Sequence, residues 1–512
     1  MLSAIPTVAL VCCLCMTAMS APTYRLAAFE VVGFEPTVID PQGAEATSFD
    51  LVPAGDLERT PRDYVSARVM ATARGDSKAA LVLVDALGKE HRGPLVELSA
   101  GEEKELVVEA RRGKQPISML RALRLFAEGQ AVEVSGLQVV CAAEHLPQPD
   151  ATVEGPMDDT SIQVALDSLG EDGGVVYIPP GEYVIGETVT IPCDNVTIYG
   201  AGKDTILQGV WFQTKPMLLA EGRQDIRITR LHFRSLPLET FRGYNVARYA
   251  EKPEDVGRPT LTSLGIGLYG GCRRIRVDHC EIERFGYGGV LIRDGSELCF
   301  DHCFFHENFR SGLGYGIVPC GTDECYIEDN NFENHRHGTA GGRDTNASYT
   351  ARFNRFVKDR KAVPETGWNQ VTSHEIDVHS GCKWLYAHDN WVEMKNGTMS
   401  AGACLRGNSG WLWNNTFVNC SRGVRVVGAS DDVWTWDNTC VNVTSPTYSS
   451  ATGTINFDEK PEDFVPIDYP YSLNETGWWP GARAEAPYAD ARPATQFAGP
   501  HGGRPLRLVS DE

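Results

Sequence analysis

The sequence predicts an all-β chain in which a small β-sandwich precedes a β-solenoid of parallel coils. Two observations lead to this prediction. Residues 22–145 contain short runs of alternating apolar and polar residues, separated by Gly- and Pro-containing turns, and this pattern is typical of an antiparallel sandwich. Between Val277 and Thr439, short phrases rich in Asp, Asn and aromatic residues recur with a base period near 23 residues, as in a solenoid.

Length and charge limit the classes of function. A chain of 512 residues is too long for one small core, so we expect two domains or one long repetitive one. The net charge of -21 argues against nucleic acid and anionic membrane as partners, because both need a basic face. An anionic substrate held by a few local arginines stays compatible with this charge, and we expect a monomer.

The first 20 residues predict a secretory signal. They are apolar and uncharged and end in Ala18-Met19-Ser20, although no Lys or Arg stands near the start. We therefore expect a secreted, periplasmic or cell-surface protein, with an N-terminal membrane anchor as the alternative. The twelve cysteines that follow fit no metal-binding knuckle. Export would permit disulfides among them, whereas Cys280 and Cys303, each after Asp-His, could instead be small core residues.

Residues 22–145 are predicted to form an accessory β-sandwich. All ten tryptophans lie at position 211 or later, and sugar-binding faces usually need flat aromatic residues. We therefore favour a structural or linking role for this domain. Residues 146–157, with three prolines, are expected to link it to the second domain, residues 158–445.

The second domain opens with phrases that resemble a known superfamily. Asp159-Thr160-Ser161 can cap a short helix over residues 162–169. The phrases Gly-Gly-Val-Val-Tyr-Ile-Pro-Pro-Gly at 173–181 and Ile-Tyr-Gly-Ala-Gly-Lys-Asp-Thr at 198–205 follow. This set resembles the opening of the pectate-lyase-like right-handed parallel β-helix superfamily of secreted carbohydrate-active enzymes. The resemblance implies that the helix caps the open end of the coil and that the two phrases form the first turns.

The internal repeat predicts the same fold independently. Between successive repeat starts the steps are 23, 28, 23, 36, 25 and 23 residues, counted at Asp278, Asp301, Asp329, Arg352, His388, Trp413 and Trp436. The asparagines of these phrases are expected to stack at successive bends, each amide bonding its neighbour. The repeat fades near residue 445, and residues 446–512 are expected to form an irregular tail.

One stretch concentrates the candidate chemistry. Residues 373–379, Ser-His-Glu-Ile-Asp-Val-His, contain two imidazoles and two carboxylates. Alternation in a strand would point Ile376 and Val378 into the core and Glu375, Asp377 and His379 outward. Aligned repeats place a coil with His337 before this strand and a coil with Arg406 after it.

The candidate catalytic residues are therefore expected on adjacent coils. They are Tyr315, His337, Tyr349, His374, Asp377, His379 and Arg406. The candidate substrate-binding residues are Arg336, Arg343, Trp368 and Glu375. The order Asn330-x-Phe332, Arg336-His337, Tyr349-x-Ala-Arg and Ser373-His374-x-x-Asp377-x-His379 also resembles a subgroup of secreted right-handed β-helix proteins, which carries over no residue role.

Three readings of this cluster stay open. In a lyase acting on uronic acids by β-elimination, Arg406 would neutralise the carboxylate and His379 or His337 would take the C5 proton. Tyr315 or Tyr349 would then protonate the leaving oxygen, and Asp377 would orient an imidazole. Such chemistry requires no cofactor.

The alternatives use the same residues differently. A glycoside hydrolase needs two carboxylates about 5–5.5 Å or about 6.5–9.5 Å apart, for which Asp377 could pair with Glu375, Asp344 or Glu393. A divalent metal could be held by His374, Asp377 and His379. The chain could also be a non-enzymatic carbohydrate-binding or adhesin protein with a polysaccharide as its partner.

Overall fold

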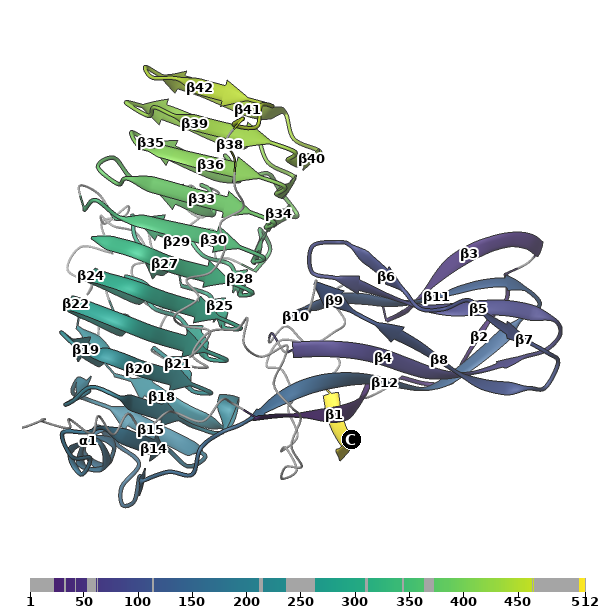
Figure 1. Cartoon of the computed structure of the whole chain (residues 1–512), viewed down its shortest axis with the longest axis horizontal. Coiled ribbons are helices and arrows are strands. Elements are labelled where there is room, and N and C mark those ends of the chain that lie inside the picture. Colours follow the sequence, from purple (N-terminus) through teal and green to yellow (C-terminus); the bar gives the residue numbers. More distant parts are fainter. Residues whose placement is uncertain are drawn as a thin grey trace, which may run out of the picture.

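The computed structural model shows two β domains (Figure 1). It describes residues 23–31, 34–41, 43–52, 61, 63–112, 115–210, 215–235, 263–308, 312–342, 345–362, 373–462, 464 and 506–511. Residues 1–20, Arg343, Asp344 and Trp368 lie outside these ranges, so the predicted signal and two candidate substrate-binding residues are not described. Within these ranges no helix combines the length and the apolarity needed to cross a membrane.

The first domain is the predicted sandwich of two antiparallel sheets around one core. One sheet contains β1 (Thr23–Val31), β2 (Thr37–Ile39), β4 (Asp63–Ala73), β8 (Glu103–Glu109), β12 (Val132–His145) and β43 (Leu506–Asp511). The other contains β3 (Gly43–Val52), β5 (Ser77–Asp85), β6 (Glu90–Arg92), β7 (Val96–Leu98) and β11 (Leu120–Gly129). A short ribbon adds β9 (Arg111–Arg112) and β10 (Gln115–Pro116). Alternate residues such as Leu81, Leu83 and Leu125 are fully buried between the sheets, as a half-buried strand pattern requires.

The second domain is a parallel β-helix, so the predicted fold class is confirmed (Figure 1). One wall has a strand from each of ten coils: β15 (Gly181–Ile185), β18 (Thr205–Gly209), β21 (His232–Arg234), β23 (Glu281–Glu283), β25 (Phe304–His306), β28 (Asn331–Glu333), β31 (Arg355–Asp359), β34 (Trp391–Lys395), β37 (Thr416–Val418) and β40 (Thr439–Val441). A second wall contains β13 (Ala151–Thr152), β14 (Gly174–Tyr177), β17 (Val196–Tyr199), β20 (Gln224–Thr229), β27 (Thr322–Glu328), β30 (Ser348–Arg352), β33 (Trp384–His388), β36 (Ser409–Trp413), β39 (Val433–Trp436) and β42 (Ile455–Phe457).

The third wall positions the candidate residues, and we call it the site face. Its strands are β16 (Val189–Thr190), β19 (Pro216–Glu221), β26 (Tyr315–Val318), β29 (His337–Gly341), β32 (Ile376–Val378), β35 (Ala403–Arg406), β38 (Arg422–Gly428) and β41 (Ser445–Ala451). The long strands β22 (Leu264–Asp278) and β24 (Gly288–Asp301) run round a corner and belong to both the second wall and the site face.

A helix covers the first coil. Helix α1 spans Asp159–Asp167, and its N-cap is Asp158, whose carboxylate accepts the Ser161 N–H at 3.0 Å. It therefore begins before the predicted residue 162, because Asp158 makes the cap that had been expected from residues 159–161. Its buried face, which includes Ile162 and Leu166, closes the apolar interior. A short 3-10 turn, Gly202–Asp204, precedes β18.

Stacked side chains hold successive coils together. The rings of Phe305, Phe332 and Phe356 stack with centroids 4.9 and 4.7 Å apart. The predicted asparagine ladder is present: side-chain amides donate to the next asparagine at 3.1, 3.1, 2.9 and 3.0 Å along Asn330, Asn354, Asn390, Asn415 and Asn438. Each bend thus satisfies buried polar groups with the coil that follows.

Two expectations need correction. Residues 446–512 are not uniformly irregular, since β41 and β42 extend the β-helix and β43 pairs antiparallel with β1 of the sandwich. The twelve cysteines beyond the predicted signal are all free thiols, so no disulfide is present among the described residues. Cys280 and Cys303 lie in the core of the β-helix, which confirms the alternative prediction that they are small core residues. The stacked walls bury enough apolar surface without cross-links.

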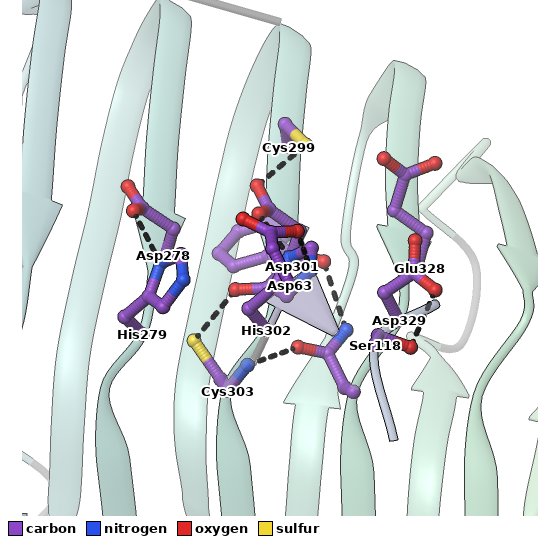
Figure 2. Close-up of polar contacts among 12 residues, drawn as sticks. Asp63, Ser118, Asp278, His279, Cys299, Asp301, His302, Cys303, Glu328 and Asp329 are labelled. Carbon is purple, nitrogen blue, oxygen red and sulfur yellow. Dashed lines mark hydrogen bonds and ion pairs between the residues drawn. The ribbon is translucent and has the colours of Figure 1, made fainter. Parts of the chain in front are cut away.

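The sandwich docks on the bends that lead into the first wall. His302 lies between two carboxylates, with Nε2 2.9 Å from Asp63 of the sandwich and Nδ1 2.8 Å from Asp301 of the β-helix (Figure 2). Nearby, the Ser118 hydroxyl donates to Asp329 at 2.7 Å. All these groups are buried, so a polar network seals the contact between the domains.

Candidate active site

The site face brings most of the predicted residues together on successive coils. Register pairs Tyr315 with His337, Thr339 with Ile376, and Ile376 with Ala403. The predicted neighbours of β32 are therefore confirmed: the His337 coil lies before it and the Arg406 coil after it. Ile376 and Val378 are fully buried in the β-helix core, as predicted.

Asp377 is the centre of the cluster. It is fully buried, and its carboxylate lies 3.0 Å from His374 Nε2, 3.3 Å from His379 Nε2 and 3.6 Å from His337 Nε2. Arg406 donates to both oxygens of the same carboxylate, through Nε at 3.1 Å and through Nη2. Although burial opposes ionisation, the hydrogen bond from His374 and the guanidinium of Arg406 hold the pKa of Asp377 well below its usual range. Asp377 is thus a fixed anion.

Two of the three imidazoles are oriented by backbone carbonyls. His337 Nδ1 lies 2.7 Å from the His374 carbonyl, and His379 Nδ1 lies 2.8 Å from the Gly341 carbonyl. Since a carbonyl only accepts, Nδ1 carries the hydrogen in each neutral ring. The bare Nε2 of each ring then faces Asp377. Burial lowers the pKa of His337, His374 and His379 and keeps the rings neutral.

Exposure separates the three rings. His337 is fully buried, stacked between the rings of Tyr315 at 5.5 Å and His374 at 4.2 Å. His374 is also buried, and its Nδ1 lies 2.9 Å from the Ser373 hydroxyl. The His379 side chain is 21% exposed and that of Arg406 is 32% exposed. These last two groups can therefore touch a ligand from outside.

Tyr315 and Arg336 form a second polar pair beside the cluster. Arg336 Nη1 donates to the Tyr315 hydroxyl at 2.7 Å, and that hydroxyl donates to the Gly312 carbonyl at 3.2 Å. Burial raises the pKa of Tyr315, against the opposite effect of Arg336, so the hydroxyl stays protonated.

The structure places two candidates inside the coil. Tyr349 is buried in the apolar core, where its hydroxyl donates to the Asp377 backbone carbonyl at 2.7 Å, so it supports β32 from within. Glu375 was expected to point outward with Asp377, and this orientation is wrong. Its carboxylate is fully buried 3.5 Å from Lys358 Nζ. Both Glu375 and Ile376 donate their N–H to the Gly402 carbonyl, and this bend breaks the alternation just before β32.

The donor atoms around Asp377 do not suit a divalent metal. His337, His374 and Asp377 offer ligand atoms within 4.8 Å of one another, which differs from the predicted trio by exchanging His379 for His337. Arg406, however, already binds the carboxylate, and its Nη2 lies 3.3 Å from His374 Nε2. A dication there would face a guanidinium at close range, so the residues do not fit a metal while Arg406 is in place.

Sequence reasoning missed the arginines that flank the cluster. Arg293, Arg422 and Arg425 stand at outward positions of the site face, in register with His379, His374 and Asp377 respectively. Lys358, which meets Glu375, was also missed. The inward orientation of Lys358 was predictable, because it stands two residues after Phe356 and therefore on the inward side of β31.

Comparison with known proteins gives fold-level likeness only. No family model and no curated protein matches this chain. Solved structures similar to it include an exopolygalacturonase from Thermotoga maritima (13% identity, TM-score 0.37, 64% of this chain and 96% of that one). They also include an alginate lyase from Paenibacillus sp. (15% identity, TM-score 0.36, 60% of this chain and 98% of that one). A third is a GH87 alpha-1,3-glucanase from Streptomyces thermodiastaticus (13% identity, TM-score 0.29, 88% of this chain and 99% of that one). At such low scores, only this chain's own residues bear on its activity.

Proposed function

We propose that this protein is a polysaccharide-degrading enzyme, and specifically a lyase that cleaves a uronic-acid-containing polysaccharide by β-elimination. The observation that carries the proposal is the charge of the site face. Its outward rows from β22 to β41 contain Arg293, Arg406, Arg422 and Arg425 and one carboxylate, Asp377, in a chain of net charge -21. One exposed carboxylate, Asp294, follows Arg293 in β24. The Asp377 carboxylate is buried and paired with Arg406. A polyanion fits such a surface.

The arginines lie on both sides of the cluster. The guanidinium of Arg293 is exposed over the Tyr269 ring at 4.9 Å, and that of Arg422 lies over Tyr448 at 4.5 Å. Neighbouring coils stack about 4.8 Å apart, so a charged chain running along the site face would meet a cation on each side of His379. Flat rings beside these cations suit sugar rings.

The proposed mechanism assigns three roles. Arg406 neutralises the substrate carboxylate, which makes the C5 proton more acidic. His379 Nε2 takes that proton, and the new imidazolium is stabilised by Asp377 and by the bond from Nδ1–H to the Gly341 carbonyl. The C4–O bond then breaks as a C4=C5 double bond forms. Tyr315 turns its hydroxyl away from the Gly312 carbonyl and protonates the leaving oxygen.

Hydrolysis is less well supported. It needs a second carboxylate that faces the same bond as the first. Asp377 is held by Arg406 and His374, and Glu375 points into the coil. Neither carboxyl group is therefore placed to act as the acid of an acid–base pair. Of the other two predicted partners, Glu393 lies on β34 of the first wall, and Asp344 lies outside the described residues. As part of the same proposal, the enzyme acts outside the cytoplasm as a monomer.

The test is incubation with a panel of polyuronates, following the ultraviolet absorbance of the unsaturated product and, in parallel, new reducing ends. Absorbance that rises with reducing ends is the expected result. Arg406→Ala should lower kcat by roughly 10²–10³-fold, whereas Arg273→Ala, which removes an exposed arginine paired with Glu297 on the second wall, should not. Reducing ends without absorbance would reassign the protein to hydrolysis, and binding without either would make it a carbohydrate-binding protein.

A further inference from the structure

The residue at position 375 differs from the residues at the equivalent position of the neighbouring coils. From β22 to β38, the other residues in register with Glu375 on the site face are all glycine: Gly265, Gly289, Gly316, Gly338, Gly402 and Gly423. A Cβ at Gly338 would come within 2.5 Å of the Phe356 ring, and one at Gly402 within 2.1 Å of Phe417. These glycines leave room for phenyl rings that fill the interior from the opposite wall.

The β32 coil fills this space differently. Along the phenylalanine row, Phe356 pairs in register with Val392, which pairs with Phe417. The coil that contains Glu375 therefore has the smaller valine where its neighbours have a phenyl ring. The space so released is occupied by an ionisable pair, Glu375 and Lys358, whose side chains are both fully buried. A buried pair of this kind seldom contributes net stability compared with apolar residues.

Each member of the pair binds the backbone around the imidazoles. Lys358 Nζ donates to the carbonyl of Arg336 at 2.9 Å and to that of His374 at 3.3 Å. Glu375 Oε2 accepts the Gly338 N–H at 2.6 Å. The same His374 carbonyl accepts Nδ1–H of His337. The peptide groups on either side of His337 and the carbonyl that sets its tautomer are thus held from inside the coil.

We propose that Lys358 and Glu375 are positioning residues: from the interior of the β-helix they fix the backbone that orients His337 and His374 around Asp377. The proposal rests on the proposed function for its catalytic consequence, and on geometry alone for its structural one. Neither side chain touches substrate. A pair kept only for stability would be replaceable by the residues that the neighbouring coils use at the same positions.

The neighbouring coils supply the test variant. Glu375→Gly restores the glycine of the row, and Lys358→Met introduces the residue found in register on the next coil, Met394. In the full-length double variant we expect kcat to fall roughly 10- to 100-fold with KM little changed, as when a nearby misplacement disturbs catalytic geometry. The urea midpoint should stay close to wild type. Ile228→Val, a core change far from the site, is the matched control and should leave kcat unchanged.

Nitrogen NMR of the His337 ring gives a readout that needs no turnover. Wild type should show Nδ1–H, and the double variant should lose this single tautomer. Wild-type kcat and an unchanged His337 tautomer would overturn the proposal. If wild type itself forms no unsaturated product, the lyase proposal fails, while the NMR result still decides the positioning role. Should the double variant not fold, the single variant Lys358→Met, which removes the donor to the Arg336 and His374 carbonyls, is subject to the same two criteria.

Discussion

The protonation state of His379 is set by a balance among its immediate neighbours. Burial and the guanidinium of Arg406 lower its pKa, while Asp377 and the Gly341 carbonyl raise it, and the net direction is downward. The ring is therefore neutral at a pH where an ordinary histidine, with a pKa of about 6.5, is already half charged. A neutral ring with a bare Nε2 is what proton abstraction needs.

This balance predicts the acid limb of the pH profile. The limb of kcat/KM should lie below the usual histidine range, because activity persists until His379 gains a proton. In Arg406→Gln, Asp377 would act on the ring without its counter-charge, so the limb should move to higher pH while the maximum rate falls. An unchanged limb in that variant would mean that another group is the base. The measurement is kcat/KM against pH for both proteins.

The asparagine ladder links the central coils to one another at their bends. Asn390 donates to Asn415 Oδ1 and to the Ala351 carbonyl, and its own Oδ1 accepts from the Asn354 N–H and side chain. All of these groups are buried or nearly so. Removing one rung leaves several buried partners without a bond, and each costs about 1–3 kcal/mol.

Asn390→Ala should therefore lower the free energy of unfolding by roughly 2–4 kcal/mol, since at least two partners are orphaned. Urea denaturation measures this change. Asn456→Ala, a half-exposed asparagine on β42, should change it by less than about 0.5 kcal/mol. Equal effects at both positions would show that the ladder has no special role.

The two domains are joined through a histidine held between two carboxylates (Figure 2). Burial disfavours the imidazolium of His302, but Asp63 and Asp301 raise its pKa well above the usual value. The His279 ring stacks on His302 with centroids 4.9 Å apart, and Arg276 donates to Asp301. Because the folded-state pKa is raised, this stabilisation is complete below the unfolded pKa of about 6.5. The stabilisation is lost as pH rises through the pKa of His302 in the folded state. At the acid end, Asp63 and Asp301, whose pKa values are lowered, lose their contribution as they gain protons.

Thermal unfolding of the whole chain should therefore show a decline in Tm as pH rises from neutrality. His302→Gln removes the positive charge and leaves buried carboxylates short of a partner, so it should lower stability by roughly 3–5 kcal/mol at pH 6. It should also flatten the alkaline decline. His91→Gln, which affects an Asp85 contact inside the sandwich, is the control; a decline that persists in His302→Gln would point to other groups.

Fold and site differ in how far the sequence predicts them. Repeat spacing and asparagine phrases predict the coils, because each coil repeats the same local chemistry. Strand alternation correctly placed Ile376 and Val378, yet it failed one residue earlier at Glu375, where a bend turns the side chain inward. Tyr349 was predicted to be a catalytic residue, although its alternation with Ala351, which is core, indicated the interior. Pairing across walls, such as Lys358 with Glu375, depends on three-dimensional closure that no local pattern reports.

The glycine row has a consequence for protein engineering. Gly316, Gly338 and Gly402 are each matched to a phenyl ring from their own coil. These coils are therefore interchangeable only as complete modules that exchange both residues together. A chimeric coil that combined a glycine at position 375 with Val392 would leave a void in the interior. A coil that combined Glu375 with a phenylalanine at position 392 would have a steric clash. Of the coils from β26 to β37, only the one containing β32 departs from this code, and grafting the candidate site into another solenoid would require moving its interior along with its surface.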